Sequence, residues 1–192
     1  TGLITRLKGV TVRDIGECVK VDPETGLLFE EKHPFFPKDL KGGRYRRSNW
    51  VWDGARKMIS LIGARGEYVA FQIVIDRGPN TLENVDVKIS ALSGSKGKIG
   101  SSNIECFREW YVYCPQSEPS VSNFFPLGEG WYPDALIPFT DEGGAGAPFS
   151  VPSDDFAEPS GKKPKQRNQA VWIDVYIPEE TVGGVYEGTV LI

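Results

Sequence analysis

The chain has 192 residues, of which 40% are hydrophobic and 25% are charged, and its formal net charge is −4. This composition is close to that of ordinary globular domains, and a chain of this length can bury enough surface to fold without disulfide bonds. The negative charge repels polyanions, so we do not expect nucleic acid as a partner. No window approaches the ~20 consecutive apolar residues of a membrane-spanning helix, so we do not expect a membrane partner either.

The N-terminal part predicts one or two strands followed by an irregular region. Residues 1–21 contain the branched run LKGVTVRDIGECVKV, which ends at the turn sequence DPETG. Asp, Pro and Gly together favour a tight turn. From about residue 30 to residue 55 the chain mixes Pro, Gly, charges and aromatics without a period of two or 3.6 residues. We therefore predict a long loop over residues 30–55.

The middle of the chain carries the clearest strand signals. In residues 67–76, EYVAFQIVID, apolar side chains alternate with more polar ones, which is typical of a strand with one buried face. Residues 84–91 repeat the alternation and predict a second strand, and the Gly- and Ser-rich residues 92–102 predict a loop. Residues 104–114, IECFREWYVYC, are bulky on both faces and predict a central or covered strand.

Residues 115–167 form a proline-rich stretch without a clear period, so we predict a second long loop. Loops of this length are usually functional, partly disordered, or contain strands that the pattern hides. Residues 171–177 alternate again, with Trp172, Asp174 and Tyr176 opposite a buried set of Val and Ile. After a turn, residues 186–192 predict a final strand, and the two runs together predict a hairpin.

These elements predict an all-β fold. Seven or eight strand-like runs are separated by Gly and Pro clusters, and no segment has the pattern of an amphipathic helix with capping residues. This combination favours a two-layer antiparallel β-sandwich of the immunoglobulin or galactose-binding type, with a core about 10 Å thick. We expect one domain over residues 1–192, with long irregular loops at about 30–55 and 115–167.

The sequence lacks the usual signatures of catalytic and metal sites. It has no nucleophile elbow, phosphate-binding loop, zinc protease motif or dinucleotide fingerprint. Its single histidine, His33, and its three cysteines, Cys18, Cys106 and Cys114, follow no metal-binding spacing. We therefore expect no cofactor and no metal, and we expect the cysteines to be buried free thiols.

Pairs of carboxylates are the remaining candidates for catalysis or for calcium binding, because a glycosidase needs two acids and calcium prefers oxygen ligands. The candidates by adjacency are Asp141 with Glu142, Asp154 with Asp155, and Glu129 with Asp134. All of them lie in loops rich in Gly, Pro or Ser, where acidic residues are common because they are soluble. We therefore assign no catalytic residue in this chain.

Aromatic residues in or beside the predicted loops are stronger candidates for a contact site. An exposed ring can stack on the apolar face of a sugar while a neighbouring carboxylate accepts its hydroxyl hydrogens. The alternative is that these rings close the ends of a sandwich or dock on another domain. The candidate ligand or interdomain contacts are Trp131, Tyr132, Asp134, Trp50 and Trp52.

Three motifs, in this order, resemble the N-terminal β-sandwich domain found ahead of a barrel in glycoside hydrolase family 123 and its uncharacterised relatives. They are a "G/N-E-x-x-x-F-Q" strand, a "W/Y-P-D-x-L-x-P" loop and a "W-x-x-x-x-V/I-P … G-x-Y-x-G" hairpin, and residues 1–55 contribute little. The matching positions are Gly66, Glu67, Phe71, Gln72, Tyr132, Pro133, Asp134, Leu136, Pro138, Trp172, Ile177, Pro178, Gly184, Tyr186 and Gly188.

The resemblance implies a non-catalytic module of a multidomain, carbohydrate-active protein. In that family the catalytic acids, an adjacent Asp-Glu pair, lie in a C-terminal barrel that is absent from this chain, so Asp141 and Glu142 do not correspond to them. The implied partner is that barrel, the parent protein is expected to be a glycoside hydrolase, and the implied location is secreted or periplasmic. Two other interpretations stay open: a stand-alone carbohydrate- or calcium-binding module, and an enzyme complete within 192 residues.

Overall fold

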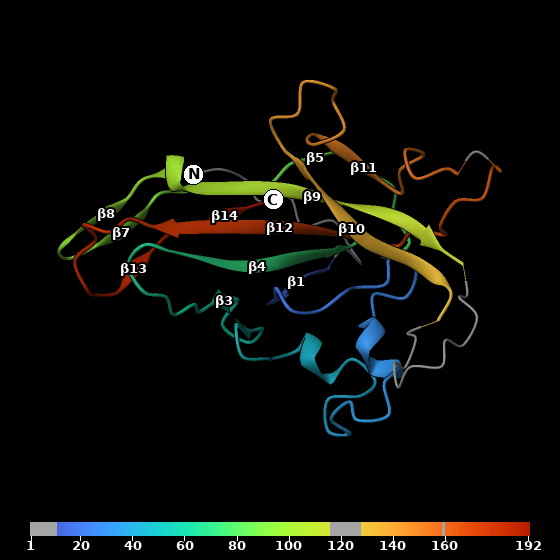
Figure 1. Cartoon of the computed structure of the whole chain (residues 1–192), viewed down its shortest axis with the longest axis horizontal. Helices are drawn as coiled ribbons and strands as arrows, with labels where there is room; N and C mark the ends of the chain where they lie inside the picture. The colour runs from blue at the N-terminus through green and yellow to red at the C-terminus, as the bar shows by residue number, and fades with distance from the viewer. Residues whose placement is uncertain (1–10, 116–127, 159) are drawn as a thin grey trace.

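A five-stranded antiparallel sheet is the centre of the computed structural model, which describes residues 11–115, 128–158 and 160–192 (Figure 1). The strand order is β1-β4-β12-β9-β10, so neighbours come from distant parts of the chain. β4 and β12 pair along their whole length, from Asp76 opposite Asn168 to Glu67 opposite Ile177. In sheet order, the strands are Thr11–Gly16, Glu67–Asp76, Asn168–Ile177, Ile104–Cys114 and Gly130–Pro138.

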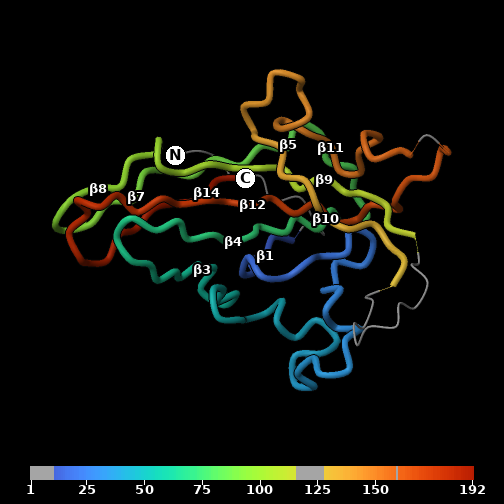
Figure 2. The backbone as a smooth tube through the Cα atoms, viewed as in Figure 1, coloured from blue at the N-terminus to red at the C-terminus, as the bar shows by residue number. Residues whose placement is uncertain are grey.

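Short strands form the second layer. β5 pairs with β11, β6 pairs with β14, and β7 lies between β8 and β13. Figure 2 shows β7 and β8 beside the far C-terminal strands at one end of the molecule, although about ninety residues of sequence separate them. These strands are Leu82–Val85, Lys88–Ile89, Leu92–Gly94, Gly97–Ile99, Phe149–Val151, Tyr186–Glu187 and Val190–Leu191.

The remaining regular elements are small. β2 (Trp52–Asp53) and β3 (Met58–Ile59) form a two-stranded ribbon. Three 3₁₀ turns, η1 (Phe29–Lys32), η2 (Arg44–Arg46) and η3 (Ser101–Asn103), are the helical elements among the described residues. No helix in the described part of the chain is long and apolar enough to cross a membrane.

The main core lies between the large sheet and the short strands. Phe71, Ile73 and Ile75 of β4 point to this side, and the alternating Val and Ile residues of β12 lie beside them. From the second layer, Leu82, Val87, Phe149 and Val151 close the core. The predicted all-β, two-layer antiparallel sandwich is therefore confirmed, and period-two alternation is its physical basis because alternate side chains share one face of a strand.

Residues 17–47, which we call the N-terminal cover, pack on part of the other face of the large sheet. Val21, Leu28 and Tyr45 of the cover form a buried cluster with Val74 of β4 and Ala170 of β12. In Figure 1 the cover, drawn in blue to cyan, lies beside one end of the strands. The predicted irregular region is therefore an ordered third element that covers only part of the sheet face.

Three local predictions are wrong, and all concern short strands. Residues 84–91 do not form one strand, because β5 ends at Val85, one residue after Asn84 with its left-handed φ of 55°, and β6 begins only at Lys88. Residues 92–102, which the sequence predicts as a loop, contain the β7–β8 hairpin. Residues 186–192 form two short strands that pair with β7 and β6, so the predicted hairpin with β12 is absent.

The second predicted loop also contains a long strand, β10, and the short strand β11. β10 pairs with β9 but its register shifts between Pro133 and Ala135. This bulge changes the parity of the side chains within the strand, and proline weakens the strand signal, so the sequence shows no period of two. Residues 116–127, within the same prediction, lie outside the described residues.

The cysteines are free, as predicted, but their predicted burial is wrong for two of them. Cys18 and Cys114 are exposed, and Cys106 is half-buried. Burial, followed by the charge of Asp86, raises the pKa of the Cys106 thiol to about 11. The Cys106 thiol is therefore protonated and poorly nucleophilic at neutral pH.

Candidate functional site

The structure places the five aromatic and acidic candidates at two opposite edges of the large sheet. Trp131, Tyr132 and Asp134 lie on β10, the edge strand at one side. Trp50 lies against Gly16 at the end of β1, the edge strand at the other side, and Trp52 lies in the neighbouring ribbon. The two groups do not form one site.

On β10, the aromatic rings pack inside the domain. Trp131 is only 6% exposed and lies 5.3 Å from the ring of Tyr113. Tyr132 stacks on Phe29 of the N-terminal cover at 3.9 Å, and its hydroxyl donates to the carbonyl of Gly128. Asp134, at the bulge, is the exposed member of this group.

At the β1 edge, the two tryptophans have different environments. Trp52 is 8% exposed and belongs to the interior, whereas Trp50 is 60% exposed. Asn49 fixes this turn, because its side chain donates to the carbonyl of Asp14 and accepts from the amides of Val51 and Trp52. Trp50 is therefore the one tryptophan of the predicted set whose ring is largely available to a partner.

A different group of side chains gathers where the N-terminal cover leaves the sheet uncovered. Alternate residues of β4, β12 and β9 point to this side, and their register partners point the same way. Tyr68 and Glu105 are exposed, and the other members of the group are partly buried. We call this surface the open face, and its members are Tyr68, Ala70, Glu105, Phe107, Trp172, Asp174 and Tyr176.

The open face has three rows that run across the strands. Trp172 lies opposite Phe107 in the first row, and Asp174 lies opposite Glu105 in the second. In the third row Tyr176 lies opposite Tyr68, with ring centroids 4.8 Å apart and planes tilted by 38°. Carboxylates therefore lie between two rows of aromatic rings.

The middle row places two acidic side chains opposite each other on neighbouring strands, which is unfavourable in a sheet. Asp174 and Glu105 carry the same charge directly opposite each other, an arrangement that destabilises a strand pair. The indole nitrogen of Trp172 donates to Asp174 Oδ1 at 2.7 Å, so the ring leans along the strand toward the middle row. A like-charge pair that lowers local stability is typical of a functional surface.

The sequence alone indicates the β12 members of the open face but not those of β4 and β9. The alternation of Trp172, Asp174 and Tyr176 places them on one side of a strand, and this could be read from the chain. Tyr68 and Glu105 lie beside them because of the strand order β4-β12-β9. This order brings together residues that are about 37 to 108 positions apart in the sequence.

A cavity of about 440 Å³ lies on the other side of the sandwich, between β5, β11 and the loops beside them. Its floor is Arg108, whose side chain is 1% exposed and lies between the rings of Trp110, Phe149 and Phe156. Arg108 donates to Asp155 Oδ2 at 2.8 Å. The guanidinium is therefore a fixed part of the interior rather than a free ligand-binding group.

Three of the six acids considered from the sequence form ion pairs, and Asp141 accepts from the Ala145 amide. Burial on its own raises the pKa of Asp155, but the hydrogen bonds from Ser153 and Arg108 lower it below the usual value. Such an acid does not donate a proton near neutral pH. The ion pairs of the sequence candidates are Asp154 with Lys163 at 2.6 Å, Asp155 with Arg108 at 2.8 Å, and Glu129 with Lys162 at 3.0 Å.

Two buried acids have strongly raised pKa values. Burial raises the pKa of Asp14 to about 7 and that of Glu109 to about 8, with the charge of Lys20 acting in the opposite direction on Glu109. Asp14 lies opposite Ile73, on the core side of the sheet, whereas Glu109 has the parity of Phe107, on the other side. Because the sheet separates them, they cannot act as an acid and base pair on one substrate.

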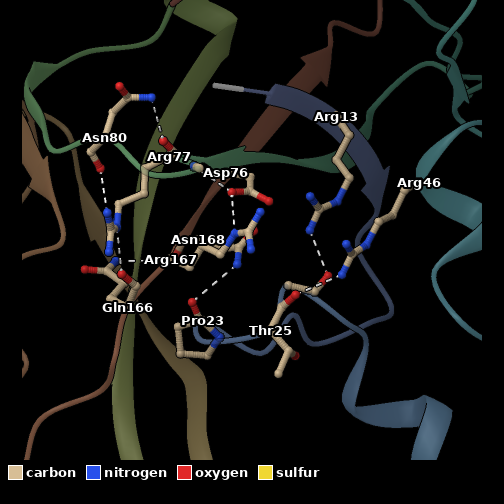
Figure 3. Close-up of polar contacts among 12 residues, drawn as sticks. Arg13, Pro23, Thr25, Arg46, Asp76, Arg77, Asn80, Gln166, Arg167 and Asn168 are labelled. Carbon is tan, nitrogen blue, oxygen red and sulfur yellow. Dashed lines mark hydrogen bonds and ion pairs between the residues drawn. The ribbon is translucent and has the colours of Figure 1, made fainter. Parts of the chain in front are cut away.

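Polar contacts attach the N-terminal cover to β1 and to the start of β12, where Asn168 Nδ2 donates to the carbonyl of Pro23 (Figure 3). Asp76 accepts from Arg167 Nε at 2.9 Å, and Arg13 donates to the carbonyl of Gly26 at 2.8 Å. Arg46 donates to the carbonyl of Thr25 at 2.9 Å. Although burial raises the pKa of Asp76, its hydrogen bonds from Arg167 and the Gly78 amide lower it overall. This network holds the 22–26 turn and is structural.

Replacing Gly26 tests this attachment. Gly26 has φ +66°, and a Cβ there would lie 2.5 Å from Asn168 Oδ1 and 2.8 Å from Arg13 Nη2. Gly42 has φ +74° with no atom within 4 Å of its Cβ position, so it is a matched control. We expect Gly42→Ala to cost about 1 kcal/mol of unfolding free energy from the left-handed backbone alone, and Gly26→Ala to cost about 1 kcal/mol more. Urea denaturation measures both, and equal losses would contradict the contact.

Comparison with solved structures shows a likeness of fold. No family model matches the sequence, and no curated protein matches it. Among solved structures, the chain is similar to a family 123 glycoside hydrolase from Clostridium perfringens, with 15% sequence identity and a TM-score of 0.53. The match covers 94% of this chain but 24% of that chain, so this chain spans about a quarter of the length of its neighbour. The two share a fold.

Proposed function

We propose that this chain is a non-catalytic β-sandwich module of a longer protein related to the glycoside hydrolases, where it supports a C-terminal catalytic barrel. The observation that supports the proposal is the fold likeness, in which nearly the whole chain matches a quarter of a family 123 glycoside hydrolase. The positions of the titratable groups agree with it. The two acids whose pKa values are most strongly raised, Asp14 and Glu109, are buried on opposite faces of the sheet, and the acid beside the cavity is held by Arg108.

The outer edge of β10 is our proposed contact with the barrel. β10 is an edge strand of the large sheet, and an edge strand presents backbone groups that another segment can cover. Asp134 and Leu136 are exposed on this strand, while the buried Trp131 and the stacked Tyr132 fix its position from below. The packing of Trp131 therefore supports the contact surface rather than forming it.

The proposal can be tested with the longer protein that carries this chain and with the chain alone. We expect the longer protein to hydrolyse aryl glycosides and the chain alone to be inactive. Asp134→Lys reverses an exposed charge at the proposed contact, so it should lower the melting temperature of the longer protein and leave that of the isolated chain unchanged. Glu83→Lys, an exposed acid on β5 in the other layer, is the matched control. Hydrolysis by the isolated chain would overturn the proposal.

A further inference from the structure

The open face lacks the chemistry of an apolar docking surface. Its middle row holds Asp174 and Glu105 on neighbouring strands. Covering these carboxylates with an apolar protein surface would remove their water without replacing its hydrogen bonds, which is costly for charged groups. A suitable occupant must donate several hydrogen bonds to the middle row and present apolar surface to the rows on either side.

The aromatic rows set the shape of such an occupant. Trp172 and Tyr176 are four residues apart on β12, so the two rows are separated by about 13 Å along the strand. Phe107 and Tyr68 extend the rows onto the neighbouring strands. The surface is therefore an elongated platform, suited to a chain of linked rings rather than to one small molecule.

From these features we propose that the open face binds a neutral carbohydrate chain. The C–H faces of the sugar rings lie on Trp172 and on the Tyr68–Tyr176 pair, and sugar hydroxyls between them donate to Asp174 and Glu105. The bond from the Trp172 indole to Asp174 positions the ring before the ligand arrives, which reduces the entropy lost on binding. The carboxylates also select by charge, because a polyuronate would bring like charges onto the middle row.

This binding role goes beyond that of a structural support, and it needs only the folded sandwich. Its test can therefore fail while the module proposal stands. Tyr68, on β4, lies three strands away from β10, whose outer edge we assign to the barrel, while Phe107 at the other end of the platform pairs with Pro138 at the end of β10.

The experiment titrates the 192-residue chain with three neutral sugars, cellohexaose, mannohexaose and chitohexaose, and with the acidic hexagalacturonate. Tryptophan fluorescence is the signal, because Trp172 lies in the platform. We expect saturable binding of at least one neutral hexasaccharide in the millimolar range or tighter, and none of hexagalacturonate. Tyr68 is 63% exposed, so Tyr68→Ala should keep the wild-type melting temperature and weaken binding by about tenfold.

Trp50→Ala is the matched control, because Trp50 is another exposed aromatic residue but lies at the β1 edge. It should bind the neutral sugar as the wild type does. The proposal is overturned if none of the three neutral sugars changes the fluorescence, if hexagalacturonate binds as tightly as they do, or if Trp50→Ala abolishes binding while Tyr68→Ala does not. It is also overturned if Tyr68 and Trp172 are protected from hydroxyl-radical oxidation by another domain of the longer protein.

Discussion

Glu109→Gln should make the protein more stable than the wild type at pH 8, by about 4 kcal/mol of unfolding free energy, and about equally stable at pH 4.5. The wild-type side chain is 3% exposed, and burial raises its pKa from 4.5 to about 8. In the folded protein Glu109 is therefore protonated at neutral pH, while in the unfolded chain it is ionised. Glutamine has nearly the same shape as the protonated acid and does not ionise.

The direction of the pH dependence of stability follows from the number of protons bound by the folded and unfolded states. Between pH 4.5 and 8 the folded state holds a proton on Glu109 that the unfolded state has released, so raising the pH favours unfolding. The contribution of the buried, protonated Glu109 to the free energy of unfolding is fully present below pH 4.5. It is lost as the pH rises toward 8, at about 1.4 kcal/mol per pH unit. Asp14 acts in the same direction up to about pH 7, so some pH dependence remains in the single variant.

Urea denaturation at half-unit steps from pH 4.5 to 8.5 measures the difference. Asp76 and Asp155, whose pKa values are lowered, stay ionised over this range and do not contribute to it. The double variant Asp14→Asn/Glu109→Gln should remove most of the remaining slope. Parallel stability curves for the wild type and Glu109→Gln would mean that Glu109 titrates as an exposed acid does.

The second large effect concerns Arg108 and Asp155. Asp155→Ala should cost about 2 kcal/mol of unfolding free energy, because it leaves a buried guanidinium without its charge partner, and the loss is smaller than for a fully buried pair since Asp155 is half-exposed. In the wild type, Arg108 Nη1 contacts Asp155 and the carbonyl of Ala145, while Nε and Nη2 have no hydrogen-bond partner. The half-exposed Asp155 is therefore the counter-charge of a cation that water hardly reaches.

Arg108→Met removes the buried charge of this ion pair without leaving a large cavity, since methionine fills much of the same space among the rings and carries no charge. Removing the buried charge together with its partner is often nearly neutral, so Arg108→Met/Asp155→Ala should be more stable than Asp155→Ala alone. Thermal unfolding followed by circular dichroism measures all three variants. If the double variant loses the sum of the two single losses, the residues act independently and the ion pair is not what stabilises this site.

The two proposals use different parts of the sheet. Residues of β10 at the sheet edge supply the contact with a barrel, and side chains on the surface of β4, β12 and β9 supply the carbohydrate platform. The N-terminal cover limits the platform, because it occupies one part of the sheet face and does not bury the aromatic and acidic rows, of which Tyr68 and Glu105 are exposed and the rest partly buried. The hydrogen bonds from Arg13 to the Gly26 carbonyl and from Asn168 to the Pro23 carbonyl hold the 22–26 turn of the cover on the sheet.

The sequence by itself determined the long strands and the class of fold. In β4 and β12 the side chains alternate without interruption, and alternation depends only on the geometry of an extended chain. Elements whose alternation is interrupted could not be found in this way. The bulge at Pro133 hid β10, and the two-residue strands β6, β13 and β14 are too short to show a period.

Only the tertiary structure decided which residues share a surface. The sequence singled out Trp131 and Trp52 as contact candidates, but packing buries both rings, because burial depends on elements that come from elsewhere in the chain. Conversely, Tyr68, Glu105 and Trp172 become neighbours through the order β4-β12-β9. Local pattern fixes which way a side chain points, whereas strand pairing between distant segments fixes what lies beside it.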